Sequence, residues 1–322
     1  MYRIGIDLGG TNIAAGLVNE NYEIVAKSSV PTRAAERTQE EIAAVMGELC
    51  FTLCAQAGVK MEEVEAIGVA SPGIADHDNG VVVYTNNLPL LDFPVCKLLS
   101  EMTGVASVHV ENDANAAAWG EAVAGAAKGT KNSVMITLGT GVGGGIIIDG
   151  KVCSGFNYAG GELGHIVIEK DGVPCTCGRR GCWESYSSAT ALIRMTKEKI
   201  EECHKTGRET AMDALVAAKG KVSGRTAFDG MRQGDAAATE VVDKYISYLA
   251  TGITNIVNIF QPEVFTIGGG VSGEGDNLLV PLREKVAKET YSKDNTLKTD
   301  LRVATLGNDA GIIGAAAFAT KH

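Results

Sequence analysis

Apolar residues recur in two similar patterns near the start and the middle of the chain. Residues 3–18 (RIGIDLGGTNIAAGLV) and 133–153 (SVMITLGTGVGGGIIIDGKVC) each begin with an apolar strand, which runs through a turn of glycine and threonine into a second apolar strand. The two segments begin about 130 residues apart, which indicates an internal repeat of one β-hairpin. We therefore expect two similar lobes, each organised around such a hairpin.

Helical and extended patterns alternate along the rest of the chain. Apolar residues recur at helical spacing in 37–57, 94–103, 183–199, 236–260, 278–290 and 310–319. Short apolar runs predict strands at 22–28, 64–70, 80–84, 108–110, 264–267 and 301–306, and the polar stretch 204–236 predicts only short helices. Asn308 and Asp309 stand at the expected cap of the last helix. This alternation predicts an α/β protein with parallel or mixed sheets that carry helices.

The turns of the two hairpins are rich in residues that suit phosphate binding. Bare backbone N–H groups in such turns form anion cradles, and threonine hydroxyls add donors. The cradle residues are Gly9, Gly10, Thr11 and Asn12 in the first turn and Gly139, Thr140 and Gly141 in the second. A plain tight hairpin would also use glycine, but two matching turns favour a phosphate site.

A dinucleotide-binding motif is a poorer interpretation of the second turn. Gly139, Gly141 and Gly144 match its spacing, but the run Ile146–Ile148 after them predicts a strand, whereas the motif needs a helix. A third glycine turn follows strand 264–267. At Gly269 the backbone could approach a base or a ribose closely.

The segment 162–184 (ELGHIVIEKDGVPCTCGRRGCWE) combines metal ligands with carboxylates. His165, Cys175, Cys177 and Cys182 form a tetrahedral zinc set, spaced His-x9-Cys-x-Cys-x4-Cys, and its glycines allow tight turns. The alternatives are disulfides or ordinary thiols, but three cysteines cannot pair fully and Cys-x-Cys is a poor local disulfide. With all four positions filled by protein, the metal is predicted to be structural and to hold Glu162 and Glu184 in place as a wall for a polar ligand.

An alanine-rich helix is predicted to begin abruptly after strand 108–110, in the sequence ENDANAAAWG (111–120). Asp113 stands at this junction and has two interpretations. It could be an N-cap, or it could be a general base at the carboxyl end of a strand beside the glycine cradle. The local sequence leaves both interpretations open.

Composition and charge exclude several classes of protein. The chain has 322 residues, enough for about two domains. Its net charge of −10 argues against an extended nucleic-acid surface. It contains no apolar run long enough for a membrane span and starts directly in a strand pattern, so we expect no signal peptide. Eight cysteines without an export signal predict a reducing cytoplasm, with Cys50 and Cys54 as small buried hydrophobes.

Taken together, the motifs resemble those of the ROK sugar kinases, which belong to the actin/hexokinase-like (ribonuclease H-like) phosphotransferases. The resemblance spans almost the whole chain and rests on the order of five motifs: DLGGTN (7–12), ENDAN (111–115), LGTGVGGG (138–145), E-x-G-H (162–165) and C-x-C-G-x-x-G-C-x-E (175–184). Residues 182–188 (CWESYSS) are most similar to the pattern of the family's bacterial glucokinases.

The resemblance implies ATP-dependent phosphorylation of the 6-hydroxyl of glucose in a cleft between two lobes. Asp113 would be the general base, and Asp7 would anchor hydrated Mg²⁺. His165 would serve twice, with one ring nitrogen on zinc and the other facing the sugar. The sugar would be bound by Gly73, Asn86, Asn112, Asp113, Glu162, His165 and Glu184, and the nucleotide by Asp7, Gly9, Gly10, Thr11, Asn12, Gly139, Thr140, Gly141 and Gly269.

The lobes are expected to comprise residues 1–115 plus 308–322 and residues 116–307, and the protein is expected to be a homodimer or homotetramer in the cytoplasm. Alternative substrates are an N-acylhexosamine, namely N-acetylglucosamine or N-acetylmannosamine, and fructose or mannose. A sugar-responsive repressor is disfavoured, since the first strand is expected at residue 3 and leaves no room before it for a helix-turn-helix. A sugar-binding module without catalysis would need neither glycine hairpin.

Overall fold

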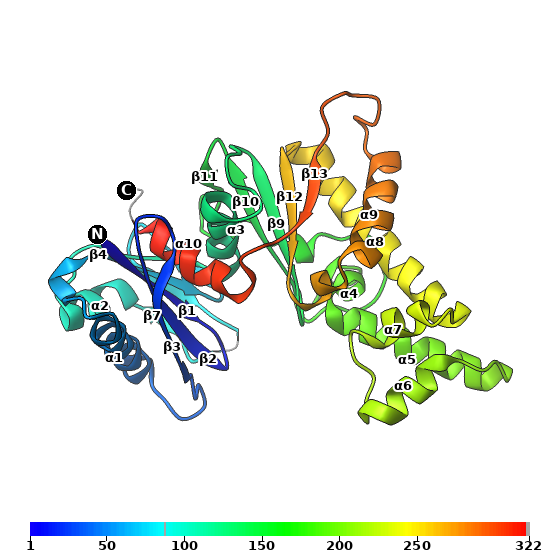
Figure 1. The fold of residues 1–322 in the computed structure, drawn as a ribbon, viewed down its shortest axis with the longest axis horizontal. Helices are drawn as coiled ribbons and strands as arrows, with labels where there is room; N and C mark the ends of the chain where they lie inside the picture. Colours follow the sequence, from blue (N-terminus) through cyan, green and yellow to red (C-terminus); the bar gives the residue numbers. More distant parts are fainter. Residues whose placement is uncertain (87, 320–322) are drawn as a thin grey trace. The chain divides into compact units, whose positions relative to one another are not determined.

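The computed structural model describes residues 1–86 and 88–319 and divides the chain into two compact units (Figure 1). Unit 1 comprises Met1–Met135, Gly145–Gly161 and Ala304–His322, and unit 2 comprises Ile136–Gly144 and Glu162–Val303. The division falls within strands β9 (Ser133–Leu138) and β10 (Val142–Ile148). The predicted α/β class with mixed sheets is confirmed.

The first sheet has the strand order β3-β2-β1-β4-β8. The pairs β1–β2 and β2–β3 are antiparallel, whereas β1–β4 and β4–β8 are parallel. Its strands are β1 (Tyr2–Leu8), β2 (Asn12–Val18), β3 (Ile24–Pro31), β4 (Val64–Ser71) and β8 (Val108–Asn112). The mixture follows from the chain path, because hairpins join antiparallel strands and helices join parallel ones.

Successive residues of β1 point to opposite faces of this sheet, and helices cover both faces. Ile4, Ile6 and Leu8 belong to a core that includes Ile42 and Met46 of α1 (Gln39–Ala57), and α2 (Val95–Thr103) contributes to the same core. The other face packs on α10 (Ala310–Phe318) and α3 (Asp113–Ala124). Helix α10, the last helix of the chain and red in Figure 1, therefore lies on β1, the first strand of the chain.

Glycines allow this close approach of α10 to the sheet. A Cβ atom on Gly5 would lie 1.9 Å from the carbonyl oxygen of Ile312, and one on Gly68 would lie 1.9 Å from that of Ala315. The crossing of α3 with α10 is equally tight, because a Cβ on Gly314 would lie 1.7 Å from the oxygen of Ala116. All three neighbouring atoms belong to the backbone, which cannot yield as a flexible side chain can.

The substitution Gly68→Ala is therefore expected to lower the free energy of unfolding by about 3 kcal/mol, because it overpacks the β4–α10 contact. Urea denaturation followed by circular dichroism measures this change. Gly273→Ala is the matched control, because a Cβ there meets nothing within 4 Å; we expect a change within about 0.5 kcal/mol. Equal stability of the two variants would contradict this account of the packing.

A small antiparallel sheet, β5-β6-β7, completes unit 1. It consists of β5 (Ile74–Asp76), β6 (Val81–Tyr84) and β7 (Leu91–Phe93). Only β6 was expected from the sequence, because strands of three residues leave too short a pattern to recognise.

The second five-stranded sheet has the order β11-β10-β9-β12-β13, with β11 (Lys151–Val152), β12 (Val264–Gly268) and β13 (Asp300–Val303). Counted from its own first strand, it has the same order as the first sheet, third-second-first-fourth-fifth. The internal repeat suggested by the hairpins therefore extends to the topology. Asp149 and Gly150, both with positive φ, form the tight turn that was expected between β10 and β11.

The helices of unit 2 are α4 (Glu184–Ser187), α5 (Ala189–Thr206), α6 (Ala211–Lys219), α7 (Thr226–Arg232), α8 (Ala236–Phe260) and α9 (Asp276–Glu289). Helix α8 has the predicted bounds, whereas β13 ends three residues earlier than expected. Asp309 stands at the N-cap position of α10, as predicted, but its side chain makes no capping hydrogen bond. A 3₁₀ turn, Gly307–Asp309, leads into this helix without a side-chain cap, and Asp309 instead pairs with Lys27.

Within the described residues, no helix combines the length and the apolar character that a membrane span requires.

Candidate functional site

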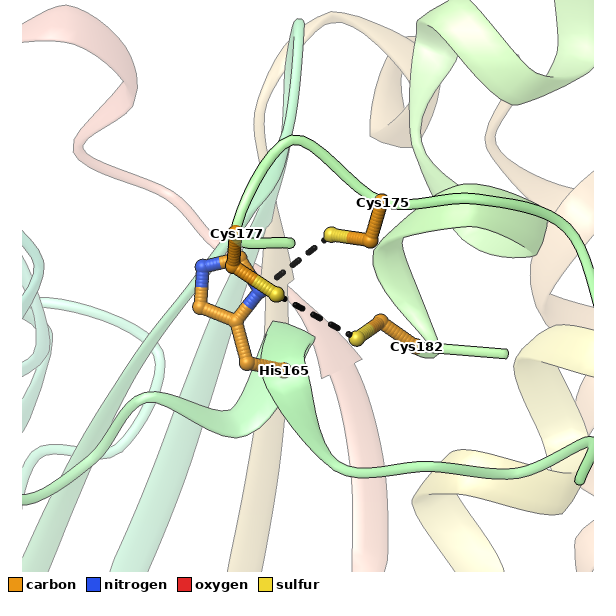
Figure 2. Close-up of side chains that lie close together, drawn as sticks. All are labelled: His165, Cys175, Cys177 and Cys182. Carbon is orange, nitrogen blue, oxygen red and sulfur yellow. Dashed lines mark hydrogen bonds between the residues drawn. The ribbon is translucent and has the colours of Figure 1, made fainter. Parts of the chain in front are cut away.

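The four predicted zinc ligands lie together in unit 2 (Figure 2). One ligand atom from each of His165, Cys175, Cys177 and Cys182 lies within 4.8 Å of all the others. The Sγ atom of Cys175 is 3.6 Å from Nδ1 of His165, and the Sγ atoms of Cys177 and Cys182 are also 3.6 Å apart. Residues separated by up to 17 positions thus converge on one point.

These distances suit a tetrahedral zinc ion. With ordinary Zn–S and Zn–N bond lengths, the edges of the tetrahedron are about 3.8 Å between two sulfurs and about 3.6 Å between sulfur and nitrogen. The backbone N–H of Arg179 also lowers the pKa of Cys177 and so favours its thiolate, the form that binds metal. The donor set therefore fits structural zinc in both geometry and chemistry.

Two isolated β-bridges, Val167–Cys182 and Pro174–Arg180, close the loop that carries these ligands. Gly181 has a φ of +77°, and a Cβ on it would lie 1.7 Å from the carbonyl oxygen of Glu169, so only glycine suits this position. Beyond the loop, the ring of buried Trp183 packs against Gly252 of α8 and its Nε1 donates to the carbonyl of Tyr248. The loop that carries the predicted zinc ligands is therefore anchored to the core of unit 2.

The two carboxylates that frame the loop differ in their surroundings. Glu162 is exposed, and its Oε2 lies 4.0 Å from Nε2 of His165, the nitrogen that does not face Cys175. Glu184 accepts a hydrogen bond of 3.0 Å from the backbone N–H of Val142, and its other oxygen is 3.8 Å from Sγ of Cys175. Glu184 thus joins the candidate metal cluster to the second glycine turn.

The start of α5 holds that turn in place. The N–H of Gly139 donates to the carbonyl of Gly141, the N–H of Ala189 donates to the carbonyl of Gly139, and Thr190 Oγ1 donates to the carbonyl of Thr140. Gly269, with φ +81°, lies against Leu138 just before the turn. A groove of about 400 Å³ within unit 2 is lined by residues of both the turn and the zinc loop, among them Thr140, Gly141, Cys175 and Glu184.

Hydrogen bonds within the turn and from a threonine also close the first glycine turn, which lies in unit 1. The N–H of Gly9 donates to the carbonyl of Asn12, while Thr32 donates its hydroxyl to Gly9 and its N–H to the carbonyl of Thr11. Gly10, Thr11 and Asn12 are exposed at the tip. Thr32 was not singled out in the sequence, because a single threonine after a strand carries no signal.

Asp7 precedes this turn and is largely buried. Burial raises the pKa of its carboxyl group, and the charge of Lys27 opposes this rise. A Cβ on Gly311, in the first turn of α10, would lie 3.2 Å from the Oδ2 atom of Asp7. The carboxylate therefore lies beside the first turn of α10.

The structure tests the cap interpretation of Asp113. Asn112 is the N-cap of α3, and its Oδ1 accepts from the N–H groups of Ala114 and Asn115. Asp113 is the first helical residue and is exposed, and its carboxylate accepts from the adjacent N–H of Ala114. The cap interpretation of Asp113 is therefore wrong, and the cap belongs to its neighbour.

Two of the predicted sugar ligands are in direct contact in unit 1. The Nδ2 atom of Asn112 donates to the carbonyl of Gly73 over 3.0 Å. Gly73 has a φ of +83°, and a Cβ on it would lie 2.0 Å from the carbonyl oxygen of Tyr84, so the site requires glycine. Asn86 lies in a bend after β6 and is exposed; Asn87, beside it, is outside the described residues.

The structure adds polar contacts that the sequence did not indicate. Glu111 is buried directly before Asn112, and it contacts His77, Asn115 and Ser154. An acidic residue at the end of a strand would be expected on the surface, so the pattern gave no reason to expect a buried carboxylate.

Comparison with known proteins assigns the family. The family model described as "ROK family" matches residues 3–322. The chain belongs to the ROK family. It is 38% identical to a glucokinase of Thermotoga maritima over 98% of this chain and 96% of that protein. A crystal structure of a ROK family glucokinase from Streptomyces griseus, in complex with glucose and AMPPNP, superposes with a TM-score of 0.80 at 33% identity and covers both chains fully.

The family also includes regulators. A xylose repressor of Bacillus subtilis is 31% identical over 80% of this chain but only 61% of its own length. The repressor is thus matched over a smaller share of both sequences than the glucokinase of Thermotoga maritima.

Proposed function

We propose that this member of the ROK family phosphorylates the 6-hydroxyl of glucose with ATP. The observation that carries the proposal is the position of Asp113 at the carboxyl end of β8, exposed and relieved of the cap role by Asn112. The likeness to the Thermotoga maritima glucokinase and to the glucose- and AMPPNP-bound structure supports the choice of sugar and phosphate donor.

In the proposed reaction, Asp113 accepts the proton of the 6-hydroxyl. The sugar oxygen then attacks the γ-phosphorus in line, the bond from that phosphorus to the β–γ bridging oxygen breaks, and ADP leaves. Asp113 is well placed for a base because its exposed carboxylate can be reached by a substrate hydroxyl. In such transfers the protein contributes mainly positioning and charge stabilisation.

The two glycine turns are proposed to bind the phosphates of ATP. Each presents backbone N–H groups and one threonine, Thr11 or Thr140, and Gly269 supports the second turn from behind. Asp7 would hold hydrated Mg²⁺, whose charge neutralises the phosphates. A carboxylate that is buried beside a helix N-terminus suits this role, because a bound cation offsets its burial.

The zinc cluster is proposed to orient the sugar ligands. With Nδ1 of His165 on the metal, its Nε2 carries the proton and is a defined donor to a sugar hydroxyl, next to Glu162. Glu184, held by Val142, would accept from another hydroxyl. Gly73, Asn86 and Asn112 are proposed as the further sugar contacts. The ion would supply rigidity and no reactive position.

We place the protein in the cytoplasm, because its proposed substrate ATP and three metal-binding thiolates require that environment. A homodimer or homotetramer is the proposed assembly, which light scattering of the purified protein tests directly.

A coupled assay of ADP release tests the function. We expect glucose to give the highest kcat/KM among glucose, mannose, fructose, N-acetylglucosamine and N-acetylmannosamine. Glucose offers the full set of hydroxyls to Glu162, His165 and Glu184 without an added acyl group. A higher kcat/KM for an N-acyl sugar would transfer the assignment to an N-acylhexosamine kinase. Absence of turnover with every one of these sugars would refute the proposed kinase activity.

A further inference from the structure

A buried carboxylate stands two residues before the proposed base. Glu111, in β8, has only 2% of its surface exposed. Its Oε1 accepts from the backbone N–H of Asn112 over 2.8 Å and from Nδ2 of Asn115 over 3.1 Å. Its Oε2 accepts from Oγ of Ser154 over 3.2 Å. A buried carboxylate needs such donors, and it also needs a compensating charge.

His77 can supply that charge. It stands in the turn between β5 and β6, with 19% of its side chain exposed, and its Nδ1 lies 3.3 Å from Oε2 of Glu111. Its ring packs edge-on against Tyr158, with centroids 4.9 Å apart, and lies 6.0 Å from the ring of Phe318 in α10. Aromatic neighbours on two sides thus hold the imidazole in contact with the carboxylate.

The contacts continue from Glu111 to the proposed sugar site. Glu111 binds both the N–H of Asn112 and the side chain of Asn115, two residues of the junction between β8 and α3. Asn112 in turn caps α3 and binds the carbonyl of Gly73. Asp113 lies inside this set, between the cap and the first buried turn of the helix.

We propose that His77, as an imidazolium paired with Glu111, is a positioning residue that fixes the junction carrying Asp113. The proposal rests on the proposed kinase function for its catalytic consequence. His77 touches neither the proposed base nor a proposed ligand of the sugar. It acts through Glu111, whose Oε2 faces His77 and whose Oε1 holds the cap residue and the first turn of α3.

The charge of His77 makes the positioning of this junction dependent on pH. The groups that face His77 are Glu111 from β8, Asp76 and Asp78 from its own turn, and Tyr158 from the segment after β11. Its contact with Glu111 raises the pKa of His77, although burial opposes the rise. Because the folded pKa lies above the unfolded value of about 6.5, the stabilisation is complete below that value and is lost as the pH rises through the folded pKa.

The substitution His77→Asn tests the proposal, because the asparagine amide can still donate near the position of the Nδ1 atom but carries no charge. We expect kcat for glucose to fall about tenfold with the KM for ATP unchanged, and the loss of activity on the alkaline side of the wild-type profile to disappear. His204→Asn is the matched control, since His204 forms an exposed pair with Asp213; we expect wild-type kcat. Wild-type kcat and an unaltered pH profile in a folded His77→Asn variant would overturn the proposal.

A second measurement does not depend on turnover. In wild-type protein, the ring signal of His77 in proton NMR should titrate above about 6.5, and in Glu111→Gln it should return towards that value. The signal of His204 serves as the internal reference. An ordinary His77 pKa in the wild type would overturn the pairing even if the variants fail to fold. Absence of hexose turnover in the wild type would refute the kinase function alone.

Discussion

Replacement of Asp113 with asparagine is expected to lower kcat for glucose by roughly 10²- to 10⁴-fold, the range that a positioned general base contributes. The substitution removes the proton acceptor but keeps an oxygen that can accept from the N–H of Ala114. Since Asn112 caps α3, the start of the helix does not depend on the Asp113 carboxylate. The variant should therefore fold normally, with an unchanged circular dichroism spectrum and unfolding temperature.

Steady-state kinetics with saturating ATP measure this loss. The matched control is Asp243→Asn, which changes an exposed aspartate on α8, and we expect it to leave kcat within a factor of about two. Near-normal turnover of Asp113→Asn would exclude Asp113 as the base. A comparable loss in Asp243→Asn would show that the effect on kcat is not specific to position 113.

The second large effect is expected for Cys177→Ser. A serine hydroxyl is a poor zinc ligand, so the bound zinc should fall from about one ion per chain to nearly none. Without the ion, only weak contacts connect His165 with the thiols, and the Nε2 donor and Glu162 lose their fixed places. We expect the KM for glucose to rise at least tenfold, because an orienting contact of this kind is worth about 10- to 100-fold.

Elemental analysis of protein purified without chelators measures the zinc, and hexose kinetics measure the KM. Cys96→Ser is the control, because Cys96 lies in α2 of unit 1 and is not part of the metal cluster. Treatment of the wild type with a chelator should raise its KM for glucose as Cys177→Ser does, and added zinc should restore the original KM. Wild-type protein that contains no zinc would refute the metal site.

Most of the elements could be predicted from local patterns. The long helix α8 was predicted with its correct bounds, since apolar residues recur at helical spacing over 25 residues and Pro262 follows its end. The two hairpins were recognised because glycine and threonine interrupt apolar runs at matching places. Short strands such as β5 and β7 were not, because three residues show no period.

Some features of the candidate site could likewise be predicted from local sequence patterns, and others could not. The cluster of the four candidate metal ligands was predicted because cysteine and histidine in this pattern have few other uses in a chain of this composition. The contact between Gly73 and Asn112 and the tie from Glu184 to Val142 join residues 39 and 42 positions apart, and no local pattern carries that information. The role of Thr32 in closing the first turn was missed for the same reason.

By itself, the amino-acid sequence determined the α/β class, the repeated hairpins, the candidate zinc set and the family resemblance, because each depends on residue types at short and regular spacing. Only the tertiary structure decided which asparagine caps α3, that α10 packs on the first sheet through glycines, and that His77 meets a buried Glu111. Caps, close backbone contacts and buried charge pairs depend on which atoms meet in space. Those contacts are set by the packing of the whole unit, which a short segment of sequence does not reveal.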